Sequence, residues 1–102
     1  MIFGLNPAHT KILQDIFKQH LRRGSVIIYG SRVKNTQTKY SDIDLVLKQS
    51  NLNTHHLEDL IDDIIESDLP YLCDIQLFEN IKNASLLDHI DRMGKVFYRG
   101  DK

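Results

Sequence analysis

The order of two hydrophobic patterns along this chain leaves few folds open. Three short apolar segments are typical of buried strands: 25–29 (SVIIY), 42–47 (DIDLVL) and 71–78 (YLCDIQLF). Three longer segments have apolar residues at helical spacing: 7–23, 54–68 and 84–93. A short strand or tail follows at 96–98. Strands interleaved with helices predict one α/β (α+β) domain, residues 1–102, with helices packed on a single sheet. The pattern leaves open which strands are parallel.

Capping and helix-breaking residues mark the ends of the first two helices. Asn6 and Pro7 suit the start of the first helix, and Gly24 suits its end. Pro70 prevents continuation of the second helix. The second helix has an apolar stripe that consists of Leu57, Leu60, Ile61, Ile64 and Ile65.

Charge and composition exclude several classes of protein. The chain has 13 Lys and Arg against 14 Asp and Glu, so it lacks the basic excess of a protein that binds nucleic acid by bulk charge. No apolar segment approaches the roughly 20 residues of a membrane span. The single cysteine, Cys73, cannot form an internal disulfide, and the N-terminal residues do not resemble a signal peptide. We therefore expect a cytoplasmic protein that binds neither membranes nor, directly, nucleic acid.

Two aspartates on the second predicted strand are candidate metal ligands. Strand side chains alternate, so Asp42 and Asp44 share a face about 7 Å apart, while Ile43 points into the core. Mg²⁺ typically binds one or two carboxylates together with substrate phosphates and water. Taken alone, this pair also fits a half-exposed strand with polar outward positions.

Gly30 and Ser31 break the first predicted strand, and a short helical turn could begin there. Glycine allows backbone to approach a ligand closely, and amides at a helix start attract phosphate. Arg32, Lys34 and Lys39 add three cations before the next acid, Asp42. Cations for phosphates beside carboxylates for a metal are what metal-assisted phosphoryl chemistry requires.

A third acid, Asp74, lies on the third predicted strand between Cys73 and Ile75. If this strand is next to the one that carries Asp42 and Asp44, all three acids share a face. Asp74 would then be a metal ligand or would take the proton from an attacking hydroxyl. An acid at a strand edge that is paired with an arginine is the structural alternative.

These residues resemble a known family. The pattern Gly30-Ser31-x10-Asp42-x-Asp44 is similar to the signature of DNA polymerase β-like nucleotidyltransferases, and the string GSRVKNTQTKYSDIDL resembles their minimal single-domain branch, the MNT proteins. The resemblance implies a small mixed sheet with helices packed on it. It also implies that Gly30 and Ser31 hold the triphosphate of ATP. From their charge, we expect Arg32 and Lys39 to bind the nucleotide as well.

The resemblance further implies a reaction and a metal site. Asp42 and Asp44 would bind two Mg²⁺ ions, and Asp74 would complete the acidic triad and activate the acceptor. The reaction would pass a nucleoside monophosphate from an NTP to a hydroxyl and release pyrophosphate.

The acceptor is expected to involve another chain, because few residues follow Asp74. MNT proteins are typically paired with a HEPN protein, a helical RNase toxin encoded nearby, and some add AMP to a toxin tyrosine. The resemblance thus implies an antitoxin in a homo- or hetero-oligomer. Two alternatives stay open: a catalytic subunit that modifies a small molecule such as an antibiotic, and a non-enzymatic antitoxin that binds a toxin.

Acidic residues cover one face of the second predicted helix: Glu58, Asp59, Asp62, Asp63 and Glu66. This face is either solvated or docks to a basic partner. The five histidines have no zinc-site spacing and are expected at the surface or at element boundaries.

Overall fold

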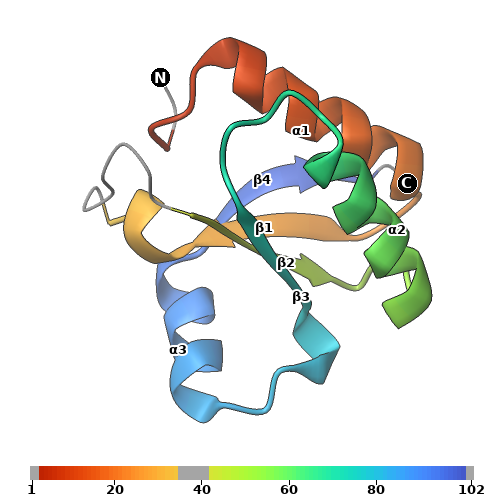
Figure 1. Ribbon diagram of the computed structural model, residues 1–102. Helices are drawn as coiled ribbons and strands as arrows, with labels where there is room; N and C mark the ends of the chain where they lie inside the picture. Colours follow the sequence, from red (N-terminus) through yellow and green to blue (C-terminus); the bar gives the residue numbers. More distant parts are fainter. Residues whose placement is uncertain (1–2, 35–41, 101–102) are drawn as a thin grey trace.

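The computed structural model describes residues 3–34 and 42–100. Along the chain its helices and strands are, in order, α1 (Pro7–His20), β1 (Ser25–Tyr29), β2 (Ile43–Lys48), α2 (Thr54–Ile65), β3 (Cys73–Leu77), α3 (Ala84–Met93) and β4 (Lys95–Arg99) (Figure 1). Short 3-10 turns follow β1 and β3, at Gly30–Arg32 and Phe78–Asn80. The predicted α/β fold is confirmed. Within the described ranges, no helix is long and apolar enough to cross a membrane.

The four strands form one mixed sheet in the order β3-β2-β1-β4. β1 is antiparallel to both β2 and β4, whereas β2 and β3 are parallel. The register pairs Tyr29 with Asp44 and Asp44 with Asp74. Three neighbouring strands therefore bring these residues into one row across the sheet.

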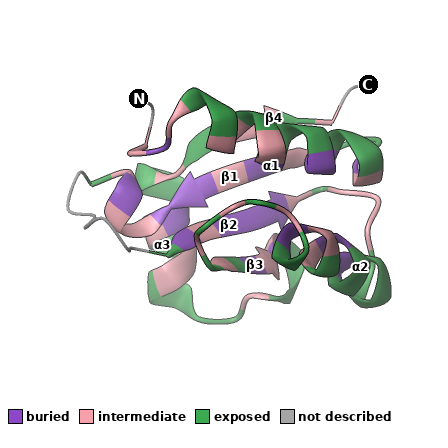
Figure 2. Ribbon diagram, turned by 45° about the horizontal axis from the view of Figure 1, so that its top comes forward, coloured by how far each residue is buried: buried purple, intermediate pink, exposed green. Residues whose placement is uncertain are grey.

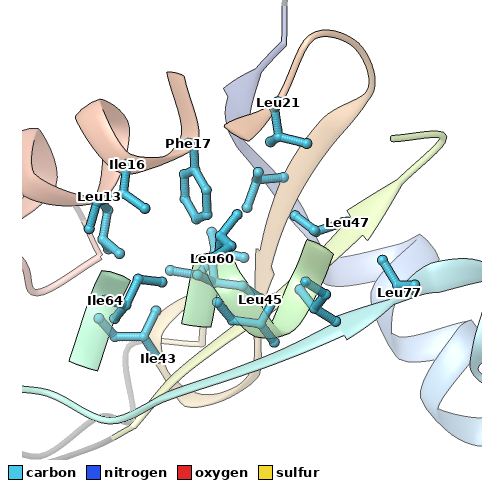
Figure 3. Packing of buried hydrophobic residues seen from close by; sticks show 14 of the residues in the cluster. Leu13, Ile16, Phe17, Leu21, Ile43, Leu45, Leu47, Leu60, Ile64 and Leu77 are labelled. Atoms are coloured by element: carbon cyan, nitrogen blue, oxygen red, sulfur yellow. The ribbon is translucent and has the colours of Figure 1, made fainter. Parts of the chain in front are cut away.

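The helices divide between the two faces of the sheet. α1 and α2 cover one face, where Phe17, Leu60 and Leu45 belong to the main apolar core (Figure 3). A smaller cluster around Tyr29, Val46 and Ile90 lies on the other face, beneath α3. Figure 2 shows the buried strands β1 and β2 between helices whose outer surfaces are exposed. β2 is covered on both faces, so a polar side chain on this strand is at least partly shielded from solvent.

Two helices end earlier than the sequence predicts. α1 ends at His20, because Leu21 is already extended, and Gly24 instead forms the turn into β1 with a φ of +87°. α2 ends at Ile65, where the Ser67 hydroxyl donates to the Ile64 carbonyl and replaces a helical hydrogen bond. In both cases a local cap ends the helix before the predicted glycine or proline does.

Candidate functional site

The three predicted acids lie at one end of the neighbouring strands β2 and β3. Asp44 is in β2 and pairs in register with Asp74 of β3, while Asp42 directly precedes β2. Ile43 is fully buried on the α1 and α2 side, so the alternation of β2 turns Asp44 toward the face that α3 covers. Asp42 and Asp74 are exposed, and Asp44 is half-buried. The two acidic strands are neighbours, which is the condition under which the sequence predicts that the three acids share a face.

The carboxylates influence one another electrostatically. Burial, then the neighbouring charges of Asp74 and Asp42, raise the pKa of Asp44 above its ordinary range, while His89 and Arg32 act to lower it. No group of three His, Cys, Asp or Glu side chains in the described parts of the chain converges in a metal-binding cluster. Two carboxylates that repel each other nevertheless fit Mg²⁺, which needs only one or two protein carboxylates.

The turn after β1 lies directly against these acids. Gly30 has a φ of +82°, and a Cβ at this position would overlap the Asp44 carboxylate. The Val33 and Lys34 amides both donate to the Gly30 carbonyl and close the 3-10 turn, so the short helical turn expected here is confirmed. Ser31 is half-buried within it. The arrangement combines a close-packed backbone turn with a partly desolvated carboxylate.

His89 of α3 contacts the same turn. The Gly30 amide donates to His89 Nε2 at 3.2 Å, and the imidazole packs edge-on against the Tyr29 ring with centroids 6.0 Å apart. Sequence reasoning placed this histidine at a surface or boundary and missed the contact. The two residues are 59 positions apart, and no spacing in the sequence indicates that α3 packs beside β1.

Arg32, one of the three cations expected to form a positive loop, is buried in the structure. Its side chain is only 2% exposed, donates from one guanidinium nitrogen to the Phe3 carbonyl at 2.9 Å, and lies 4.7 Å from the centre of the Tyr71 ring. Lys34 is exposed, and Lys39 lies outside the described residues. Arg32 therefore supplies positive charge from inside the domain, where it lowers the pKa of Asp44.

Two further groups near the acids are held protonated. The Tyr29 hydroxyl receives a hydrogen bond from the Gln76 side chain at 3.4 Å, and burial together with Asp74 and Asp44 raises its pKa. Burial raises the pKa of the Cys73 thiol to about 12, so it is not a thiolate nucleophile at neutral pH. Neither the Tyr29 hydroxyl nor the Cys73 thiol is therefore ionised at neutral pH.

Comparisons with known proteins agree with this fold. A family model described as polymerase beta, nucleotidyltransferase matches residues 11–102. A solved toxin-antitoxin structure with AMP-PNP is 17% identical, with a TM-score of 0.69 over 88% of this chain and 73% of that one. A mutant of the toxin-antitoxin MntA-HpeT is 18% identical, with a TM-score of 0.67 over 93% of this chain and 74% of that one. No curated protein matches the chain.

Proposed function

This chain belongs to the polymerase beta nucleotidyltransferase family, and on that basis we propose that it transfers AMP from ATP to a hydroxyl of a partner protein, with Mg²⁺ as cofactor. The observation that carries this proposal is the row of carboxylates beside the Gly30 turn. Asp44 pairs with Asp74 across two parallel strands, and the turn approaches Asp44 without an intervening Cβ. The turn that we propose to bind phosphate therefore lies beside the acids that we propose to bind the metal.

The proposed reaction balances without any further reactant. The acceptor oxygen forms a bond to the α-phosphorus of ATP, the bond between the α- and β-phosphates breaks, and pyrophosphate leaves. The hydroxyl proton goes to the Asp74 carboxylate, which is exposed and so open to an acceptor from another chain. Bound Mg²⁺ would neutralise phosphate charge and polarise the phosphoryl oxygens.

The other residues bind and orient the nucleotide. Asp42 and Asp44 would hold two Mg²⁺ ions, with Asp74 as a third carboxylate. The turn at Gly30 and Ser31 would contact the triphosphate, with the Gly30 amide exchanging His89 Nε2 for a phosphate oxygen. Arg32 contributes charge from its buried position rather than a direct contact, because its guanidinium already binds Phe3 and packs on Tyr71. We also propose Lys39 as a phosphate-binding group, because it is a cation in the loop between Ser31 and Asp42.

The partner we propose is a HEPN-type RNase toxin encoded nearby, with a tyrosine as the acceptor. Both solved neighbours are described as toxin-antitoxin structures, one of them with AMP-PNP. The other has two aspartates, two positions apart, replaced by glutamate, which is the spacing of Asp42 and Asp44. These observations favour an antitoxin that inactivates its partner by adding AMP.

The test is transfer of label from α-labelled ATP, with Mg²⁺, to the protein encoded by the adjacent reading frame. Wild type should label the partner on tyrosine, as shown by intact mass and peptide mapping, and Asp44→Asn should not. Asp91→Asn changes an exposed acid on α3; it is the matched control and should label the partner normally.

A stable complex without label, unchanged in Asp44→Asn, would indicate a binding antitoxin. Label only on an added small molecule would indicate the small-molecule enzyme.

A further inference from the structure

An apolar groove lies along the outer edge of the sheet, next to the strand that carries Asp74. It has a volume of about 270 Å³ and is lined by side chains of α2, of the connection 69–72 and of β3, among them Ile61, Leu69 and Ile75. No charged side chain lines it in the part of the chain that the structure describes. β3 is an edge strand, so the groove opens at the border of the sheet rather than over its buried centre.

Two large apolar side chains at this groove are exposed to solvent. Ile65 is 70% exposed and Leu72 is 73% exposed, the two highest values among the exposed large hydrophobic residues. The sequence predicts Ile65 in the buried stripe of α2, yet the helix ends there and turns this side chain outward. Apolar groups that gather around a groove mark an interaction site, whereas single exposed ones do not.

The charge around the groove indicates what can cover it. The segment 54–75, which builds the groove, contains no lysine or arginine. Its acids are Glu58, Asp59, Asp62, Asp63, Glu66, Asp68 and Asp74. The whole chain is nearly neutral, and the lysines and arginines that balance its acids all lie before and after this segment. Because this segment has seven acids and no lysine or arginine, the groove is complementary to an apolar segment flanked by lysine and arginine.

A second copy of this chain is a poor occupant. Two-fold dimers pair the same patch on both subunits. Such a dimer through the groove would place one acidic surface against another, with no cation from either segment 54–75 to compensate. A partner of opposite charge meets no such repulsion.

We propose that this groove is the docking site for the partner protein, which inserts an apolar segment with basic flanks between α2 and β3. This inference rests on the proposed function and adds the surface through which the acceptor is presented. Leu72 precedes Asp74 by two residues, about 6.6 Å along an extended chain. The β3 side chains in the groove, Cys73 and Ile75, alternate with Asp74, so a partner bound there would reach the Asp74 carboxylate around the exposed edge strand.

The test measures binding without nucleotide, so that it does not depend on catalysis. The adjacent-frame protein is titrated with wild type and with the double variant Ile65→Ser, Leu72→Ser. The double variant should bind at least tenfold more weakly, while its melting temperature should stay close to wild type because both side chains are mostly exposed. The matched control is Val96→Ser on β4, at the opposite edge of the sheet, where 47% of the residue is exposed.

A second pair of variants tests the charge argument. Glu66→Lys with Asp68→Lys should slow association several-fold at low salt, and added salt should reduce the difference. Both residues are exposed, so the fold should tolerate the change. An on-rate equal to wild type at low salt would overturn the basic character assigned to the partner.

The outcomes separate this inference from the proposed function. Binding that is unchanged in the Ile65 and Leu72 variant, or no binding by wild type, overturns the docking site even if label transfer is observed. Binding that is lost in this variant and kept in Asp44→Asn supports the docking site even if no label is transferred. A homodimer that the Ile65 and Leu72 variant disrupts, as measured by light scattering, would also overturn the assignment to a basic partner.

Discussion

The Asp44 carboxylate occupies the space in which a side chain at Gly30 would begin. Gly30 also has a positive φ, which residues with a Cβ rarely adopt. The turn after β1 can therefore approach the acidic strand only because position 30 lacks a side chain. In the proposed enzyme, this contact sets the distance between the triphosphate and the carboxylates.

Gly30→Ala should destabilise the fold and abolish nucleotide transfer. The left-handed backbone should cost about 1–2 kcal/mol of unfolding free energy, and the new Cβ should displace the Asp44 carboxylate. Thermal unfolding and label transfer, measured where the variant is folded, check both effects. Gly24→Ala is the matched control: it has a φ of +87° and a tight contact with the Lys48 carbonyl, at the other end of β1. Equal loss of transfer in both variants would contradict the role of Gly30.

Asp44→Asn should make the protein more stable at neutral pH although it removes activity. The folded state raises the pKa of Asp44, so the folded protein binds this proton more tightly than the unfolded chain does. Wild-type stability should consequently fall as pH rises from about 3.9, the ordinary aspartate pKa, through the raised folded value. The asparagine variant should lack this fall and gain about 0.5 kcal/mol at pH 7, a small value because solvent screens a half-exposed carboxylate. Urea unfolding across this pH range is the measurement, and a variant less stable than wild type at pH 7 would refute it.

Mg²⁺ should stabilise wild type more than Asp44→Asn. A cation that binds only the folded state raises its stability, and repulsion among Asp42, Asp44 and Asp74 favours such binding. The readout is the melting temperature with and without excess Mg²⁺, which requires no nucleotide. Asp91→Asn should respond like wild type, and equal shifts in all three proteins would place the bound Mg²⁺ elsewhere.

The bounds of several helices and strands, and the face shared by Asp42 and Asp44, could be predicted from the sequence because they depend on local rules. β1 and α3 have the predicted bounds, since β-branched residues in one and a cap at Asn83 in the other decide them locally. The shared face of Asp42 and Asp44 follows from strand alternation alone.

Contacts between distant elements were not accessible in this way. Arg32 looks like a surface cation because its neighbours in sequence are polar, and its burial depends on Tyr71, which follows a different helix. Ile65 fits the apolar stripe by spacing, yet the helix ends at this residue and leaves it exposed. The packing of His89 on Gly30 depends on where α3 lies against the sheet, and periodicity does not determine that position.

His89→Ala should lower the unfolding free energy by about 1 kcal/mol, the usual value of one hydrogen bond. The variant removes the acceptor of the Gly30 amide and the edge contact with Tyr29. His89→Gln, whose side-chain oxygen can accept the same hydrogen bond, should restore part of the loss. His55→Ala, at the exposed start of α2, should have no effect. Chemical denaturation measures all three, and a neutral His89→Ala would show that the contact does not stabilise the turn.

Arg32→Lys tests whether this residue acts as a structural cation or binds the nucleotide directly. The planar guanidinium both donates to the Phe3 carbonyl and stacks on Tyr71, and an ammonium group cannot reproduce that geometry. Arg32→Lys should therefore lower the unfolding free energy by about 1–2 kcal/mol, while the folded variant should bind ATP almost as wild type does. Lys34→Gln, next to the same turn but exposed, should not change stability. Unchanged stability of Arg32→Lys together with weakened ATP binding would instead place Arg32 on the phosphates, as its charge predicts.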